Sequence, residues 1–314
     1  MDGSNLSSLC GYASALPTPF RDDAIDEQAF ANFCDWQIGQ GISALVVNGT
    51  TGEAPTLSMR EQRRLIQLAL IVAHGRVPVL AGAGANATSH AIELAQQAES
   101  AGADGLLIVT PYYNKPSQEG LFRHFRALHD ATGRPIILYD VPSRTGCALT
   151  VDTLCRLAEL PRIVGLKDAT GDLARPRALR KALGERLRLL SGDDATAFEF
   201  LGLGGDGCIS VLSNVVPREC RRLHLGCAAG EEADARLING RVKSLTAALF
   251  AESNPVPLKW ALRLMGHMSS EVRLPLCEPA ETTKALVRKA LSRLGLVGPN
   301  FVARNAVRTL SFSG

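Results

Sequence analysis

Two stretches in the middle of the chain decide how its fold is interpreted: Pro-Ile-Ile-Leu-Tyr at residues 135–139 and Arg-Ile-Val-Gly-Leu at residues 162–166. Each is a short and nearly continuous apolar run, which is typical of a strand buried on both faces of a parallel sheet. A helical pattern follows each run, so each stretch begins one strand–helix unit.

The same unit recurs along the first 230 residues, with the centres of the apolar runs roughly 20 to 33 residues apart. Eight such units predict an α/β fold, a (β/α)₈ barrel of the TIM type. A doubly wound open sheet remains the alternative, because the repeat does not reveal whether the sheet closes. The eight predicted strands are Tyr12–Leu16, Ala44–Asn48, Val77–Ala81, Gly105–Thr110, Pro135–Tyr139, Arg162–Leu166, Leu187–Ser191 and Cys208–Leu212.

No strand pattern returns after about residue 231. Helical periodicity covers residues 233–250, 256–266 and 278–294, with prolines between these segments. We therefore expect a catalytic barrel over residues 1–230, a C-terminal helical region over 231–297 and a weakly patterned tail over 298–314.

Composition excludes several classes of protein. The 314 residues carry 34 basic and 31 acidic side chains, and no polybasic stripe of the kind that binds nucleic acid. No apolar stretch approaches the ~20 residues of a membrane span, and the first nine residues lack the pattern of a secretory signal. Eight scattered cysteines form no C-x-x-C pair, and the six histidines lack metal-ligand spacing. We expect a cytoplasmic protein without a bound metal.

In a (β/α)₈ barrel the functional residues lie at the C-terminal ends of the strands. Lys167 directly follows the sixth apolar run, where burial favours its neutral, nucleophilic amine. Such an amine forms Schiff bases with carbonyl compounds, and Tyr139, one strand away, can move protons. The alternative is a structural ion pair between Lys167 and Asp168 or another carboxylate.

Other strand ends carry polar or glycine-rich turns. Residues 48–53, Asn-Gly-Thr-Thr-Gly-Glu, can present hydroxyl and N–H groups to a small anion, or can simply form a turn with a helix cap. Tyr112, Tyr113 and Tyr139 suggest one shared site, although tyrosines also pack at barrel mouths. Residues 82–87 imitate a dinucleotide fingerprint and 202–207 a phosphate loop, and we interpret both as close-packed turns.

Six motifs carry a clear resemblance to a known family: GTTGE (49–53), TPYYNKPSQEG (110–120), YDVPSRTG (139–146), GLKDATGD (165–172), SGDD (191–194) and GDGCISVLSN (205–214). In this order they resemble the dihydrodipicolinate synthase/N-acetylneuraminate lyase family of Schiff-base aldolases, and within it the synthase branch. The similarity covers roughly residues 9 to 295. It implies a (β/α)₈ barrel with a helical C-terminal region, usually assembled as a homotetramer of two tight dimers.

The resemblance also implies catalytic roles for matching positions. Lys167 would form the Schiff base with pyruvate, and Tyr139 would donate and accept protons. Thr50 would link Tyr139 to Tyr113 in a hydroxyl relay, with Tyr113 reaching across a dimer interface into the partner's site. The imine nitrogen would be the electron sink, so neither a metal nor an organic cofactor is expected.

Substrate-binding roles follow from the same resemblance. Thr51 and the backbone of Ile209 would hold pyruvate, while Arg144 would bind the carboxylate of L-aspartate 4-semialdehyde. The implied reaction is condensation of these two compounds to 4-hydroxy-tetrahydrodipicolinate, a step of diaminopimelate and lysine biosynthesis.

Feedback-regulated members of the family bind lysine in a cleft lined by a Glu, two His, an Asn and a Tyr. Here Asn86 and Tyr112 match, but His90 stands at the Glu position and Met59 and Gln62 at the His positions. A missing carboxylate removes the natural partner of lysine's ammonium group. We therefore predict weak or absent inhibition by lysine.

Two rival functions stay open at this stage. N-acetylneuraminate lyases and sugar-acid aldolases share the lysine, the tyrosine and the glycine-rich turn, although Arg144 and Tyr113 in their contexts favour the synthase. A protein that binds a keto acid or a nucleotide without turnover is the second rival.

Overall fold

The computed structural model describes residue 6 and residues 9–298, and eight parallel strands form its centre. Pairing between the first strand, β1, and the last, β10, closes these strands into a barrel, with Gly11 opposite Gly207. The (β/α)₈ prediction is therefore confirmed, and the open-sheet alternative is wrong. The barrel strands are β1 (Gly11–Ala15), β4 (Ala44–Val47), β5 (Val79–Gly82), β6 (Gly105–Val109), β7 (Ile136–Asp140), β8 (Ile163–Asp168), β9 (Arg188–Ser191) and β10 (Gly207–Ser210).

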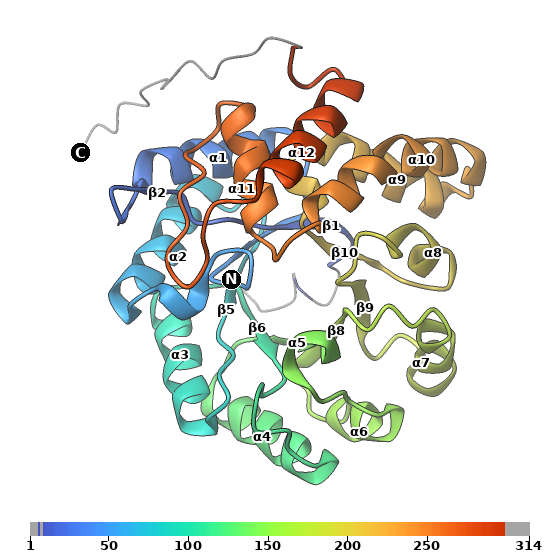
Figure 1. Cartoon of the computed structure of the whole chain (residues 1–314). Helices are drawn as coiled ribbons and strands as arrows, with labels where there is room; N and C mark the ends of the chain where they lie inside the picture. The colour runs from blue at the N-terminus through green and yellow to red at the C-terminus, as the bar shows by residue number, and fades with distance from the viewer. Residues whose placement is uncertain (1–5, 7–8, 299–314) are drawn as a thin grey trace.

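Helices surround the barrel (Figure 1). Their starts follow local signals: the Asp26 carboxylate accepts the Ala29 N–H, and Ser58 and Glu61 form a capping box. The surrounding helices are α1 (Glu27–Gly39), α2 (Met59–Ala73), α3 (Thr88–Ser100), α4 (Gln118–Ala131), α6 (Val151–Leu157), α7 (Arg175–Leu183), α8 (Ala197–Gly202) and α9 (Pro217–Ala229).

Alternation along the strands divides the core into two layers. Ile137 and Tyr139 of β7 belong to the cluster inside the barrel, whereas Ile136 and Leu138 belong to the cluster between strands and helices. A residue that follows an inward-facing one therefore faces the helices. This alternation determines which strand-end side chains face the barrel mouth.

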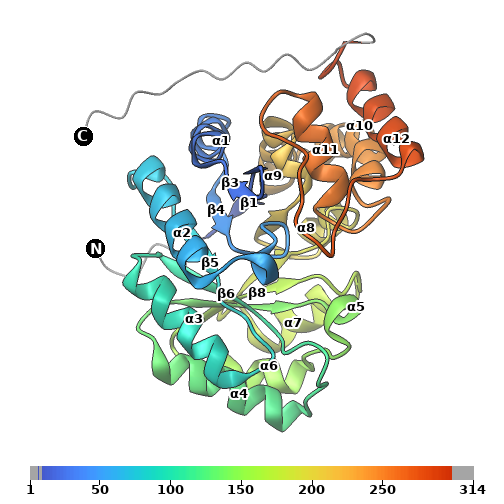
Figure 2. The ribbon, with the colours of Figure 1, turned by 60° about the vertical axis from the view of Figure 1, so that its left-hand side comes forward.

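Three helices follow the barrel: α10 (Glu232–Leu249), α11 (Val256–Leu264) and α12 (Glu281–Arg293). Helix α10 packs on α9, and α11 and α12 pack on each other at one side of the barrel (Figures 1 and 2). The helices begin and end close to the predicted segments. The division at residue 230 stays a prediction, and residues 299–314 of the predicted tail lie outside the described residues.

Several short elements were not predicted from the periodicity of the sequence. Strands β2 (Phe20–Arg21) and β3 (Ala24–Ile25) form a hairpin whose turn residues, Asp22 and Asp23, both have positive φ. This conformation is typical of a type I′ turn, and two-residue strands are too short to show a repeat. Helix α5 (Pro142–Thr145) and the 3₁₀ turns η2 (Ala54–Thr56) and η3 (Leu212–Asn214) are equally short.

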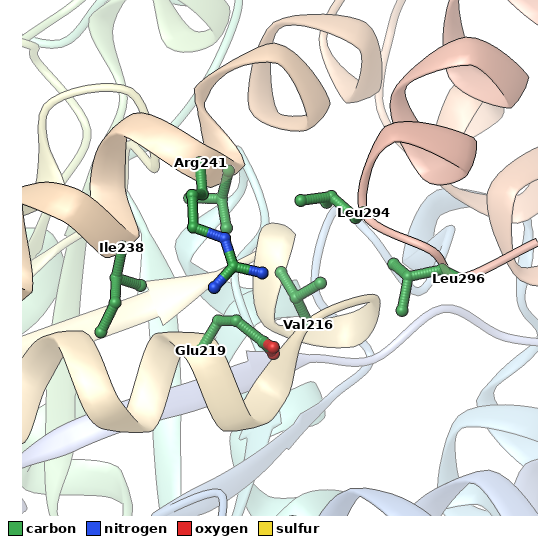
Figure 3. A pocket seen from close by; sticks show the side chains of 7 residues that line it. Val216, Glu219, Ile238, Arg241, Leu294 and Leu296 are labelled. Carbon is green, nitrogen blue, oxygen red and sulfur yellow. The ribbon is translucent and has the colours of Figure 1, made fainter.

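A small cavity lies between α9, α10 and the segment after α12 (Figure 3). Glu219 and Arg241 point toward one another across it, and Leu294 and Leu296 close one side. Its volume of about 20 Å³ is the room that one water molecule needs, so it holds no substrate. None of the described helices is long and apolar enough to cross a membrane.

Candidate active site

A larger cavity, of about 370 Å³, opens at the C-terminal ends of the barrel strands. This is the end of the barrel where the sequence predicts function, and the volume suits a small metabolite. Nineteen residues line it: Ala15, Val46, Gly49, Thr50, Thr51, Leu107, Tyr139, Val141, Ser143, Arg144, Lys167, Ala169, Thr170, Gly171, Gly192, Asp193, Val211, Phe250 and Asn254.

Lys167 and Tyr139 both line this cavity. They are register partners on β8 and β7, and the Lys167 Nζ lies 4.2 Å from the centre of the Tyr139 ring. Both side chains are buried, at 7% and 8% exposure. Within the described part of the chain Lys167 has no ion-pair partner, and the Asp168 carboxylate is held by Thr170 and Arg175 instead. The ion pair considered from the sequence is therefore not formed.

The turn after β4 brings Thr50 and Thr51 to the cavity. Asn48 and Glu53 adopt left-handed backbone conformations at the two ends of this turn. Asn254 Nδ2 donates a hydrogen bond to Thr51 Oγ1 over 3.0 Å. The hydroxyl oxygen thus accepts from Asn254, which leaves its proton free to point at a ligand.

A buried ion pair stabilises the same turn through Glu53. Lys259 Nζ lies 2.7 Å from Glu53 Oε1, and the Arg273 N–H donates to Glu53 Oε2. Burial lowers the pKa of Lys259, and the neighbouring Glu53 carboxylate opposes that shift. The C-terminal helical region therefore helps to build the turn that carries Thr50 and Thr51.

Asp194 organises the end of β10. Its fully buried carboxylate accepts the N–H groups of Val211 and Leu212 over 2.8 and 2.9 Å, together with the Ser210 hydroxyl. Burial raises the pKa of Asp194, while these hydrogen bonds lower it. Val211 lines the cavity beside this network, whereas Ile209 lies inside the barrel and is not a lining residue.

Of the two remaining predicted catalytic or substrate-binding residues, one lines the cavity and one does not. Arg144 of α5 lines the cavity, as predicted. Tyr113 is 88% exposed, has a φ of +76° and lies outside the lining set. No hydrogen bond joins the hydroxyls of Tyr113, Thr50 and Tyr139 among the residues described.

Sequence reasoning missed Phe250 and Asn254. Both come from the C-terminal helical region, and Asn254 is 203 residues from its partner Thr51. An isolated Phe and an isolated Asn carry no local signal of a site. Asp193 belongs to a quoted motif but was not assigned a role.

The residues of the predicted regulatory remnant lie at helix starts and loops on the same end of the barrel. Gln62 Nε2 donates to the carbonyls of Ala54 and Leu57, so this amide is already engaged. His90 Nδ1 lies 3.1 Å from a Glu93 oxygen, and the Asn86 carbonyl accepts from Asn114. Met59 begins α2, and Tyr112 is partly exposed after β6.

A sequence model of the Dihydrodipicolinate synthetase family matches residues 8–294. The chain belongs to this family. A 4-hydroxy-tetrahydrodipicolinate synthase of Methylobacterium radiotolerans is 50% identical over 291 residues, which cover 93% of this chain and 97% of that relative.

Two solved structures of dihydrodipicolinate synthases have closely similar folds. The chloride-inhibited enzyme of Acinetobacter baumannii, complexed with pyruvate, gives a TM-score of 0.90 at 46% identity and covers 92% of this chain and 100% of that one. A structure described as the first monomeric dihydrodipicolinate synthase variant gives 0.91 at 38% identity, covering 93% and 99%. The family predicted from the motifs is confirmed.

Among residues 6 and 9–298, no three His, Cys, Asp or Glu side chains are grouped so that they could hold a metal ion.

Proposed function

We propose that this chain is a lyase that condenses pyruvate with L-aspartate 4-semialdehyde to give 4-hydroxy-tetrahydrodipicolinate. The observation that carries this proposal is the buried amine of Lys167, which lies over the Tyr139 ring without an ion-pair partner, in a cavity at the strand ends. Membership of the family supports the choice of substrates.

The first chemical step joins Lys167 to pyruvate. Its neutral amine attacks the keto carbon, and the carbonyl oxygen leaves as water to give an imine. We assign the proton transfers of this dehydration to the Tyr139 hydroxyl, because the amine lies 4.2 Å from the centre of the Tyr139 ring. The imine nitrogen then accepts electrons as a methyl proton of pyruvate is removed, which forms a nucleophilic enamine.

The second substrate is bound through its own carboxylate. Arg144 can donate two parallel hydrogen bonds to that group, and Thr51, which also lines the cavity, holds the carboxylate of pyruvate. The contact from the Ile209 backbone is proposed on the family resemblance alone. The enamine carbon attacks the aldehyde to form the new carbon–carbon bond. The amino group of the semialdehyde then attacks the imine carbon and displaces the Lys167 amine, so one water is released in the whole reaction.

A second copy of the chain completes the proposed proton relay. Tyr113 is too exposed to serve a site within its own subunit, and its positive φ is a strained backbone conformation of the kind that persists where it serves a function. We place it in the partner's site, linked through Thr50 to Tyr139, within a homotetramer of two dimers. We assign the enzyme to the cytoplasm.

Borohydride trapping tests the Schiff base. With pyruvate, the reductant should add a pyruvate-derived mass to the peptide that contains Lys167 and leave the peptide of Lys259, which is also buried, unchanged. Lys167→Ala should abolish both the label and turnover. A label that persists in Lys167→Ala would refute the assignment.

Substrate choice separates the synthase from the rival aldolases. We expect turnover of pyruvate with L-aspartate 4-semialdehyde and no release of pyruvate from N-acetylneuraminate. The reverse preference would favour the lyase, and trapping of pyruvate without any turnover would favour a sensor.

A further inference from the structure

Two aspartate carboxylates lie next to Tyr139 and Lys167 in the sequence, on the side of strands β7 and β8 that faces away from the cavity. Asp140 follows Tyr139 on β7, Asp168 follows Lys167 on β8, and the two aspartates are register partners. Because side chains alternate along a strand, Tyr139 and Lys167 face the cavity while both aspartates face the helix layer. Asp140 is 0% and Asp168 4% exposed.

The guanidinium group of Arg175 forms ion pairs with both carboxylates. Arg175, the first residue of α7, places an Nη2 atom 2.7 Å from Asp140 Oδ2 and its Nε 3.5 Å from Asp168 Oδ2. The same Nη2 donates to the Leu149 carbonyl over 2.8 Å. The Arg175 side chain is itself only 9% exposed. Arg175 therefore ties the ends of β7 and β8 together from their outer face.

We infer that Arg175 is a positioning residue, which holds the Lys167 amine and the Tyr139 ring in their productive relation by clamping Asp140 and Asp168. This inference rests on the proposed function, since it concerns the geometry of imine formation. Arg175 itself does not line the cavity, so it acts through the two strands.

The physical reason is the cost of unpaired buried charge. Without the guanidinium, two facing carboxylates would share a site shielded from water, and removal of one partner of a buried pair is strongly destabilising. Proton uptake, water entry or separation of the strand ends would follow. Water entry or separation of the strand ends moves Lys167 relative to Tyr139, and a displacement of about 1 Å in an active site can cost a hundredfold in rate.

Arg175→Met tests this clamp. We expect its rate of imine formation, followed by quenching with borohydride at successive times after pyruvate is added, to fall about tenfold to a hundredfold. The KM for pyruvate should change less than about threefold, because the Thr51 contact is untouched. Each rate is divided by the concentration of sites that borohydride finally labels with pyruvate. Unfolded protein therefore does not lower the measured rate.

Rescue distinguishes charge imbalance from lost packing. Adding Asp140→Asn to Arg175→Met removes one unpaired charge and allows the new amide to donate to Asp168, so the double variant should recover part of the lost rate. If Arg175→Met does not fold, Arg175→Lys supplies the measurement. It keeps the charge but lacks the fork that spans two carboxylates, and its rate should fall by a smaller factor.

Arg180→Met is the matched control. Arg180 lies on the same helix and pairs with Asp206 before β10, at the opposite end of the barrel. This variant should lose stability but keep the rate of imine formation. An Arg175→Met rate within twofold of wild type, or a double variant no faster than Arg175→Met, would overturn the inference. A wild type that traps no pyruvate would overturn the proposed function and this inference together.

Discussion

Both lysines that are buried in the described chain, Lys167 and Lys259, are removed from water, and their partners separate their roles. Lys259 lies 2.7 Å from Glu53 and stabilises a turn. Lys167 has no ion-pair partner among the described residues. The Tyr139 ring lies beside its amine, and the Asp168 carboxylate is paired with Arg175. Burial alone therefore does not mark a nucleophile, and the absence of a counter-charge at Lys167 is what leaves its amine free to react.

At the same scale we predict that the enzyme is insensitive to micromolar lysine. His90 cannot replace a carboxylate as partner of lysine's ammonium group, and the Gln62 amide is already bonded to two carbonyls. The condensation rate should stay flat as lysine is added up to micromolar concentrations.

His90→Glu provides the comparison for this prediction. Restoring the carboxylate should give measurable inhibition at lower lysine concentrations than in wild type. Half-inhibition of the wild type by micromolar lysine would contradict our interpretation of these positions.

At the scale of elements, several helices begin where short-range signals place them. Asp26, Ser58 and Thr150 each accept a backbone N–H at a helix start. Such caps involve residues three apart, so a sequence displays them directly. The β2–β3 hairpin and α5 have too few residues for a repeat to be recognised.

Helix packing also makes stability depend on pH. His124 of α4 is buried and His267, which lies against Trp36 of α1, is half-buried, and loss of contact with water lowers the pKa of each to about 4. An unfolded chain binds these protons near pH 6.5, so the free energy of unfolding should fall as pH drops from about 6.5 to 4. Each histidine accounts for about 3 kcal/mol of that loss at most.

Urea unfolding at pH 7 and pH 5 checks this dependence. His124→Gln should show a smaller difference between the two pH values than wild type. His74→Gln, at an exposed helix end, should show the wild-type difference. Equal differences in all three proteins would argue against a role for His124.

At the scale of the whole molecule, we predict that two inactive variants restore each other. Lys167→Ala lacks the nucleophile and Tyr113→Phe lacks the relay hydroxyl. In a mixed dimer one site would combine Lys167 of one subunit with Tyr113 of the other. Co-expression should therefore recover about a quarter of wild-type activity, since half of randomly formed dimers are mixed and each has one intact site.

Light scattering on the wild type accompanies this experiment. A dimer or tetramer is expected, and a monomer would place Tyr113 outside any site, as would co-expressed variants that show no recovery. The similar fold of a monomeric synthase variant makes this measurement decisive for the assembly.

The candidate site was only partly predictable. Thr50, Thr51, Tyr139, Arg144 and Lys167 line one cavity, as their positions after apolar runs and the family motifs led us to expect. Tyr113, expected in a partner's site, and Ile209, expected to act through its backbone, do not line this cavity, and their roles stay predictions. Pattern analysis identifies strand ends but does not measure which side chains reach a common space.

The eight strand–helix units and their order could be predicted from the amino-acid sequence alone, and so could the candidate reactive residues at the strand ends. These are local properties, set by periodicity and turn chemistry over a few residues. Closure of the sheet, the hydrogen bond from Asn254 to Thr51 and the contacts of Arg175 with Asp140 and Asp168 became visible in the folded structure alone. Such contacts join segments far apart in the chain, so they exist only once packing of the whole barrel has placed those segments side by side.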